Sequence, residues 1–167
     1  MTGTIHAFES SRQKTNLWLK EVAAELRTED RRQAYAVLRA VLHAVRDCLP
    51  IEETAKFAAQ MPLIMQGVFF EGWRPHRKPN RLTRSEFFDE LRHQLRGQPG
   101  LDAGQAARAV FILLGRHLSA GEIEAVRRVL PHEIRDVWYE LGHHAPSPRE
   151  EAFGAYEAGA GGVPAWP

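Results

Sequence analysis

One short segment of this sequence carries the residue types best suited to binding a charged ligand. Positions 72–85 contain no acidic residue but include Trp73, Arg74, Arg77, Lys78 and Arg81. Arginine and lysine side chains pair with phosphates, and an aromatic ring stacks on bases. The segment is therefore the candidate contact for an anion, an RNA or an acidic partner. The alternative is a solvated loop in which Trp73 packs on the core and the charges keep the surface soluble.

Metal ligation is a second chemistry to weigh, because the chain has eight histidines. A divalent site needs three or four converging ligands, often from an H-E-x-x-H helix. His132-Glu133 lacks the second histidine, and His143 and His144 are adjacent, so a helix would point them apart. We therefore predict no metal and no other cofactor, with helix-end or surface histidines as the ordinary explanation.

Catalytic groups are also sought among the carboxylates and the single thiol. Acidic pairs stand where helices are expected to begin, and there they oppose the helix dipole without any catalytic role; they are Glu52 with Glu53 and Glu122 with Glu124. Cys48 ends an apolar helical face, which favours a small buried side chain over a reactive thiol. Serine-nucleophile motifs, phosphate-binding glycine loops and CxxC pairs are absent from the sequence. We predict that the chain is not an enzyme.

The totals limit the partners and the compartment. The chain has 167 residues, the size of one domain, and its 22 basic and 21 acidic residues give a net charge of +1. This balance argues against nucleic acid as the partner but leaves a local patch open. The first 20 residues lack the apolar run that a signal peptide needs, and no apolar stretch of the sequence is long enough for a membrane span. With one cysteine and thus no internal disulfide, we expect a cytoplasmic protein without a membrane span.

The elements that must position these residues follow from an internal repeat. The sequence resembles itself at a shift of 69 positions, at which Leu26, Arg39, Pro62 and Glu71 fall on Leu95, Arg108, Pro131 and Glu140. Large apolar side chains also fall on large apolar side chains. Two copies of an amphipathic unit can bury their apolar faces against each other, so the pattern predicts a duplicated helical unit.

Apolar periodicity, capping residues and prolines set the expected helices. In the first copy they span about 14–27, 31–48, 51–60 and 62–71; in the second, about 83–96, 102–117, 119–130 and 131–141. Thr83 with Glu86 and Ser119 with Glu122 have the spacing of a capping box. Pro62 and Pro131 each begin a helix, since proline lacks the N–H group that a helix interior uses. Helices 31–48 and 102–117 have the most complete apolar stripes and are expected near the centre.

The predicted fold is all-α. It is a helical bundle built by tandem duplication of a roughly four-helix unit, with an approximate internal two-fold axis. Residues 1–141 form one domain, with repeat units at about 13–72 and 82–141 and a basic linker at 73–81. Residues 142–167 are rich in Ala, Gly and Pro, which predicts a weakly structured C-terminal tail.

Several runs resemble the signature of the bacterial domain of unknown function 2267 family, over roughly residues 15–141. They are AAQMP at 58–62 and GVFFEGWRP at 67–75, then AVF at 109–111, GEIEAV at 121–126 and IRDVW at 134–138. One departure is Gln66, where the pattern usually has an arginine, whereas Arg135 keeps it in the second half. The resemblance implies an all-helical bacterial cytoplasmic protein. It brings no established activity and no catalytic residues.

Three functions remain open from the sequence. The first is a non-catalytic interaction or scaffold protein that binds an unknown protein partner or a second copy of itself. The second is an anion-binding or nucleic-acid-binding module that uses the basic linker residues Trp73, Arg74, Arg77, Lys78 and Arg81. The third is a small-ligand binder or enzyme with a pocket between the repeats.

Overall fold

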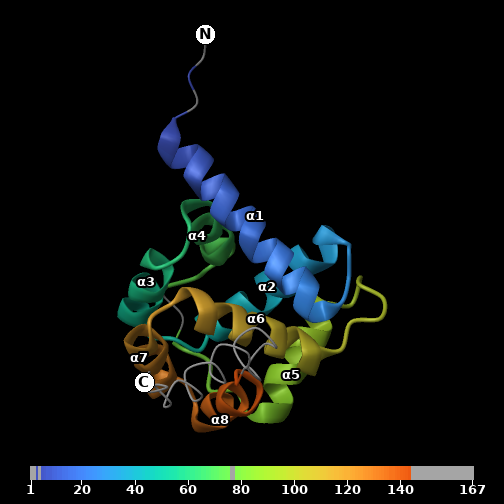
Figure 1. Ribbon diagram of the computed structural model, residues 1–167. Coiled ribbons are helices and arrows are strands. Elements are labelled where there is room, and N and C mark those ends of the chain that lie inside the picture. Colours follow the sequence, from blue (N-terminus) through green and yellow to red (C-terminus); the bar gives the residue numbers. More distant parts are fainter. Residues whose placement is uncertain (1–2, 4, 76–77, 144–167) are drawn as a thin grey trace, which may run out of the picture.

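The structure is a computed structural model that describes residue 3, residues 5–75 and residues 78–143 (Figure 1). In this part of the chain there are eight α-helices and no strand, which confirms the predicted all-α bundle. The helices are α1 (His6–Leu26), α2 (Arg31–Arg46), α3 (Ile51–Ala59), α4 (Leu63–Phe70), α5 (Arg84–Gln94), α6 (Ala103–His117), α7 (Ala120–Val129) and α8 (His132–Leu141). The predicted tail, from residue 144 onward, lies outside the described residues.

The start signals read from the sequence are present in the structure. The side-chain oxygens of Thr83 and Ser119 each accept the backbone N–H of the glutamate three residues later. The carboxylate of that glutamate accepts the backbone N–H of Thr83 or Ser119 in turn, so both capping boxes form. Pro62 and Pro131 stand directly before the first residues of α4 and α8. Proline is acceptable there because its missing N–H would have no partner inside the helix.

The first helix differs from the prediction, because α1 begins at His6 rather than near residue 14. Its buried stripe contains Ser11 and Thr15 before Trp18 and Val22. Polar side chains at the first two positions hide the apolar period on which the prediction relied. The hydroxyl oxygen of Ser11 accepts the backbone N–H of Ile64 at 2.8 Å, so a buried polar side chain joins α1 to the start of α4.

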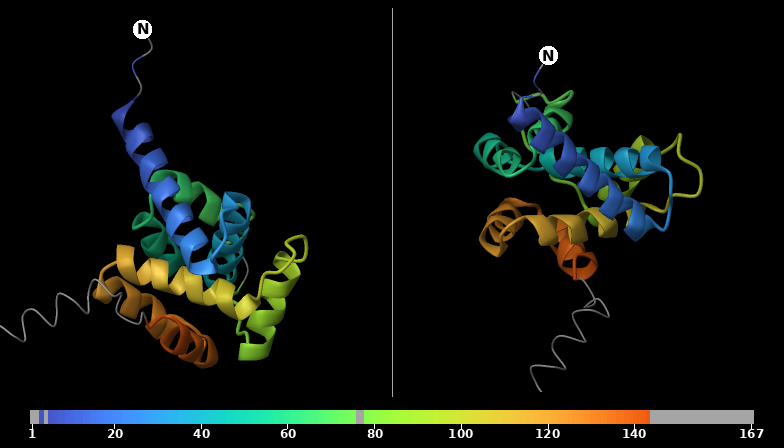
Figure 2. Two further views of the ribbon diagram at one scale, coloured as in Figure 1. Left: turned by 45° about the vertical axis from the view of Figure 1, so that its right-hand side comes forward. Right: turned by 45° about the horizontal axis from the view of Figure 1, so that its top comes forward.

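The core forms around α2 and α6, as predicted. In these two helices nearly every apolar side chain is buried, and they pack against each other near the centre of the bundle (Figures 1 and 2). Between the halves, α1 packs on α6, α5 packs on α2, and α3 packs on α7. A two-fold relation that exchanges α1 with α5, α2 with α6 and α3 with α7 would map the α1–α6 contact onto the α5–α2 contact and the α3–α7 contact onto itself. The observed pairs fit this relation. A common origin of the halves stays a prediction.

Corresponding positions in the two halves also have corresponding burial. Met65 and Phe69 of α4 are fully buried, as are Ile134 and Trp138, which stand 69 positions later in α8. In the second half, the ring of Trp138 stacks on that of Phe111 with the centroids 4.5 Å apart. None of the helices in the described part of the chain is long and apolar enough to cross a membrane.

Candidate functional site

The basic linker folds back onto the end of α2. It starts with a tight turn at Gly72, whose φ of 70° is in the left-handed region that favours glycine. The backbone N–H of Trp73 then donates to the carbonyl oxygen of Phe70 at 3.0 Å. Farther along, the backbone N–H of Asn80 donates to the carbonyl oxygen of Asp47 at 2.7 Å. These bonds hold both ends of the linker against the helices.

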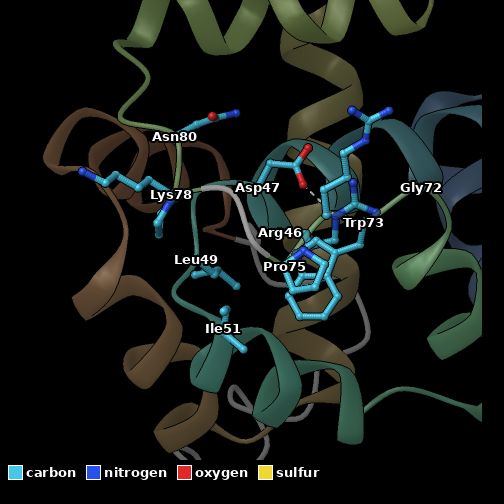
Figure 3. A pocket seen from close by; sticks show the side chains of 11 residues that line it. Arg46, Asp47, Leu49, Ile51, Gly72, Trp73, Pro75, Lys78 and Asn80 are labelled. Carbon is cyan, nitrogen blue, oxygen red and sulfur yellow. Dashed lines mark hydrogen bonds and ion pairs between the residues drawn. The ribbon is translucent and has the colours of Figure 1, made fainter.

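A pocket of about 140 Å³ lies between the linker, the end of α2 and the start of α3 (Figure 3). Three cationic side chains and one carboxylate line it, so the wall has an excess of positive charge; they are Arg46, Arg74, Lys78 and Asp47. Trp73, Pro75, Leu49 and Ile51 contribute apolar surface. The combination suits an anionic group that carries some apolar surface with it.

Arg46 forms the rigid wall of this pocket. The side chain is almost fully buried, with 4% of the residue exposed. Its Nε donates to the carboxylate of Asp47 at 2.8 Å, and its Nη1 donates to the carbonyl oxygens of Phe69 at 2.7 Å and Glu71 at 2.9 Å. Arg46 therefore satisfies the backbone at the end of α4 and fixes the point where the linker leaves the core.

The other two cationic side chains of the pocket are exposed to solvent, whereas its aromatic ring is partly packed. Arg74 and Lys78 are exposed, and no hydrogen bond or ion pair of either side chain is seen within the described residues. Trp73 is half-buried, with its ring 5.2 Å from that of Phe70. It thus packs partly on the core, as the solvated-loop alternative expects, while still lining the pocket.

The start of α3 adds a second positive element. Pro50 precedes α3 and offers no side-chain cap, and Ile51, the first helical residue, lines the pocket. Backbone N–H groups at a helix start carry partial positive charge and favour an anion. Glu52 and Glu53 in the first turn of α3 already oppose this partial charge, so the helix start adds little to the charge of Arg74 and Lys78.

The structure brings together three of the five predicted contact residues, namely Trp73, Arg74 and Lys78. Arg81 lines a separate pocket of about 220 Å³, together with Cys48 and His132. Arg77 lies outside the described residues. Sequence reasoning missed Arg46, although an arginine one position after the apolar residue Val45 in a buried helix is a signal for a partnered internal charge.

His43 is a second buried polar group that the sequence did not reveal. Its Nε2 lies 2.6 Å from the carbonyl oxygen of Val68, so His43 and Arg46 together bond three carbonyl groups at the end of α4 and just beyond it. Burial lowers the pKa of His43 below the ordinary value of 6.5, with the nearby charges of Arg46 and Arg39 acting in the same direction. The neutral imidazole therefore donates Nε2–H to the carbonyl oxygen.

The thiol of Cys48 is buried, two residues beyond the last residue of α2. Burial is the main cause that raises its pKa to about 12. A thiol with this pKa is almost entirely protonated at neutral pH, and the thiolate is the reactive form. The geometry agrees with the prediction of a small buried side chain.

A group of charged side chains joins α1 to α6. Glu25 of α1 lies 2.7 Å from Arg116 and 3.4 Å from Arg108, both in α6, and Glu21 lies 3.0 Å from His117. This network ties the two halves together. The described residues contain no group of three or more His, Cys, Asp or Glu side chains arranged to hold a metal ion.

A further pocket lies between α3 and α7, at the contact between the halves. Its volume is about 350 Å³, and it is mainly apolar, with Phe57, Ala125 and Val126 among its lining residues. Of the polar groups at the rim, Lys56 pairs with Glu52 and Glu53, and Ser119 with Glu122 forms the capping box of α7. These polar groups therefore already have partners within α3 or at the start of α7.

Comparison with known proteins identifies one family. The family model described as an uncharacterized conserved protein (DUF2267) matches residues 15–137. The matched range includes every residue that lines the pocket beside the basic linker, which we call the linker pocket, and most of α8. No curated protein matches the chain.

Proposed function

We propose a binding function without catalysis for this chain, which belongs to the DUF2267 family of uncharacterized conserved proteins. Its linker pocket would accept one anionic group, such as a phosphate or a carboxylate, on a protein partner. The observation that carries the proposal is the pairing of two exposed cations, Arg74 and Lys78, with the half-buried ring of Trp73 around one concave site. The single cysteine fits a reducing compartment, and we propose a cytoplasmic location.

The hydrogen bonds around the pocket support this assignment. Arg46 fixes the end of α4, and the bond from Asn80 to Asp47 fixes the other end of the linker. A site whose walls are already ordered loses little conformational entropy when it binds. Exposed cations on such a frame can then bond an anion at low ordering cost.

The shape of the site favours a single group over a nucleic-acid strand. A strand needs a groove that follows several phosphates in succession. Arg74 and Lys78 line one pocket, whereas Arg81 lines a neighbouring pocket that shares Pro79 and Asn80 with it, so only two of these cations surround the same concave site. We therefore keep nucleic acid as the less favoured ligand.

The test is a titration of the full chain with inorganic phosphate at low ionic strength, followed by amide NMR signals. We expect saturable shifts at Trp73, Arg74 and Asn80 that weaken as salt is added. The double variant Arg74→Gln/Lys78→Gln should raise the dissociation constant about tenfold or more. Arg128→Gln removes an exposed charge elsewhere and should leave binding unchanged. Absence of saturable shifts, or equal binding by the double variant, contradicts the proposal.

The pocket between α3 and α7 supports a second candidate, a small apolar ligand. Its apolar lining and its volume of about 350 Å³ fall within the range of ligand sites. A thermal-shift screen of small apolar compounds tests it. We expect stabilisation that disappears in Ala125→Phe, which fills the pocket, and persists in Ala24→Phe, a substitution at an exposed position of α1. A screen without any stabilising compound counts against this candidate.

A further inference from the structure

A polar cleft of about 450 Å³ lies between α2 and the end of α5. Its lining residues on α2 repeat with the helical period and therefore share one face of that helix; they are Arg32, Tyr35, Ala36, Arg39 and Ala40. Glu71, Gln94 and Gln98 complete the wall. We call this site the α2/α5 cleft.

A corresponding cleft of about 530 Å³ lies between the end of α1 and α6. At the shift of 69 positions, Gln94 corresponds to Glu25 and Arg39 corresponds to Arg108. The side chain of Glu25 is only 17% exposed, and its carboxylate lies 2.7 Å from Arg116 and 3.4 Å from Arg108. In the α1/α6 cleft the protein itself therefore supplies a carboxylate to the arginines.

Gln94 cannot supply that charge in the α2/α5 cleft, because its amide is neutral. Its Nε2 donates to the carboxylate of Glu90, one turn earlier in α5, at 2.7 Å. Its Oε1 is buried and has no hydrogen-bond partner within the part of the chain that the structure describes. The α2/α5 cleft thus lacks the carboxylate that Glu25 provides on the other side of the bundle.

The cationic side chains of the α2/α5 cleft are only partly neutralised. The Nε atom of Arg39 donates to the carboxylate of Glu71 at 3.0 Å, and the side chain of Glu71 is 55% exposed. Among the described residues, no bond of the two terminal nitrogens of Arg39 is seen, and none of the exposed side chain of Arg32. Two arginines and one carboxylate give the lining an excess of one positive charge.

A second difference between the halves lies in the same cleft. Tyr35 is 40% exposed and stands one turn before Arg39, whereas the second half has Gly104 at the corresponding position. The hydrogen bond to Glu71 is the main cause that raises the pKa of Arg39, and Tyr35 also contributes, so the two side chains lie close together. Side chains one helical turn apart can contact the same ligand. Compared with its counterpart, the α2/α5 cleft lacks a carboxylate and has an aromatic wall.

We propose that the α2/α5 cleft binds a small aromatic carboxylate. The carboxylate of the ligand accepts hydrogen bonds from the terminal nitrogens of Arg39, as Glu25 contacts Arg108 in the counterpart. The ring of the ligand packs against Tyr35, and Arg32 adds positive charge on the far side of that ring. One carboxylate balances the excess charge of the lining, which favours a monoanion. The proposal is independent of the linker pocket, since the two sites share no lining residue.

Titration of the full chain with benzoate at low ionic strength, followed by amide NMR signals, tests the proposal. We expect saturable shifts at Tyr35, Arg39 and Gln94, with a dissociation constant of about 1 mM or lower. Benzamide has the same shape without the charge and should bind at least tenfold more weakly.

Three variants test the roles of the lining residues. Gln94→Glu places a carboxylate at the position that corresponds to Glu25 and should raise the dissociation constant for benzoate at least tenfold. Glu71→Gln removes the carboxylate that competes for Arg39 and should lower the dissociation constant at least twofold. Gln105→Glu is the matched control, because it adds the same charge at an exposed position of the α1/α6 cleft. It should bind benzoate like the parent.

Circular dichroism melts show whether each variant keeps its fold. The double variant Arg74→Gln/Lys78→Gln should keep benzoate binding in the α2/α5 cleft, which separates this site from the linker pocket. Shifts confined to the linker pocket, or equal binding of benzamide and benzoate, overturn the proposal. Unchanged benzoate binding by folded Gln94→Glu overturns it as well. If Gln94→Glu does not fold, Glu71→Gln decides, because equal or weaker binding by that variant contradicts the assigned contact with Arg39.

Discussion

The Nη1 atom of Arg46 donates to the carbonyl oxygen of Phe69 at 2.7 Å, across the contact between α2 and α4. The same atom reaches the carbonyl oxygen of Glu71 at 2.9 Å. One buried guanidinium thus completes the hydrogen bonding of a helix end, where carbonyl groups have no partner within the helix. It also holds the chain at Glu71, just before the basic linker that lines the pocket.

Replacement of Arg46 by methionine should therefore destabilise the fold. The substitution keeps an apolar stem but leaves the two carbonyl groups and Asp47 without their donor. We expect a loss of about 3–5 kcal/mol in the free energy of unfolding, measured by urea denaturation. Arg39→Met is the control, because the Arg39–Glu71 ion pair is solvent-exposed and its loss should have a far smaller effect. Equal losses of unfolding free energy in Arg46→Met and Arg39→Met would contradict this structural role of the buried Arg46 side chain.

A second prediction concerns the pH dependence of stability. His43 is buried and its pKa in the folded protein is below 6.5, so the unfolded chain binds more protons between the two pKa values. The contribution of His43 to stability is present above pH 6.5 and is lost as the pH falls toward the folded value. One proton changes the unfolding free energy by at most about 1.4 kcal/mol per pH unit.

The measurement compares urea denaturation at pH 7.5 and pH 5.0. The parent should lose more stability between these values than His43→Gln, which cannot titrate. His132→Gln removes an exposed histidine and should follow the parent. An identical pH response of the parent and His43→Gln would mean that His43 does not titrate differently in the folded and unfolded states.

The helix order could be predicted from the sequence because it depends on local signals. Proline before α4 and α8 and the capping boxes of α5 and α7 act within a few residues of the helix start. The first turns of α1 escaped prediction because the buried positions there are the polar residues Ser11 and Thr15, and the Ser11 hydroxyl is used in a bond to the Ile64 N–H, 53 positions away. Such a bond leaves no local pattern.

The candidate site was predictable only in part, for the same reason. The run of cations marked Arg74 and Lys78, since charge is visible in the sequence itself. The roles of Arg46 and His43 depend on carbonyl groups at the end of another helix. Arg81 and Arg74, both marked by their charge in the sequence, line different pockets. Three-dimensional contacts of this kind decide which charges share a pocket.

A third prediction concerns the reactivity of Cys48. With a pKa of about 12, the thiol has a very small thiolate fraction at pH 8. We expect reaction with a disulfide reagent such as DTNB to be slow in native buffer and complete within minutes in concentrated urea. The denatured sample is the control for reagent and thiol content. Full reaction of the native protein within seconds would show that Cys48 is accessible and ionised.

A fourth prediction tests the central position of α2 and α6. Leu42 and Leu114 are fully buried, so truncation to alanine removes apolar contacts and leaves a cavity. We expect each substitution to lower the free energy of unfolding by about 2–5 kcal/mol. Leu17→Ala, at an exposed position, should change it little. If the unfolding transitions of Leu42→Ala and Leu114→Ala match that of the parent, the central position of α2 and α6 is contradicted.

The last prediction uses two glycines in opposite surroundings. A Cβ atom at Gly142 would lie 2.7 Å from the carbonyl oxygen of Trp138 and 3.0 Å from its side chain, so Gly142→Ala forces the buried Trp138 or the end of α8 to shift. A Cβ atom at Gly67 in α4 meets nothing within 4 Å, and alanine is the better helix former. Gly142→Ala should lower the free energy of unfolding by about 1–3 kcal/mol, whereas Gly67→Ala should raise it by about 0.5–1 kcal/mol. Thermal and urea denaturation of both variants measure the opposite signs. A stabilising Gly142→Ala would mean that Trp138 can move, and its stacking on Phe111 would then not fix the end of the bundle.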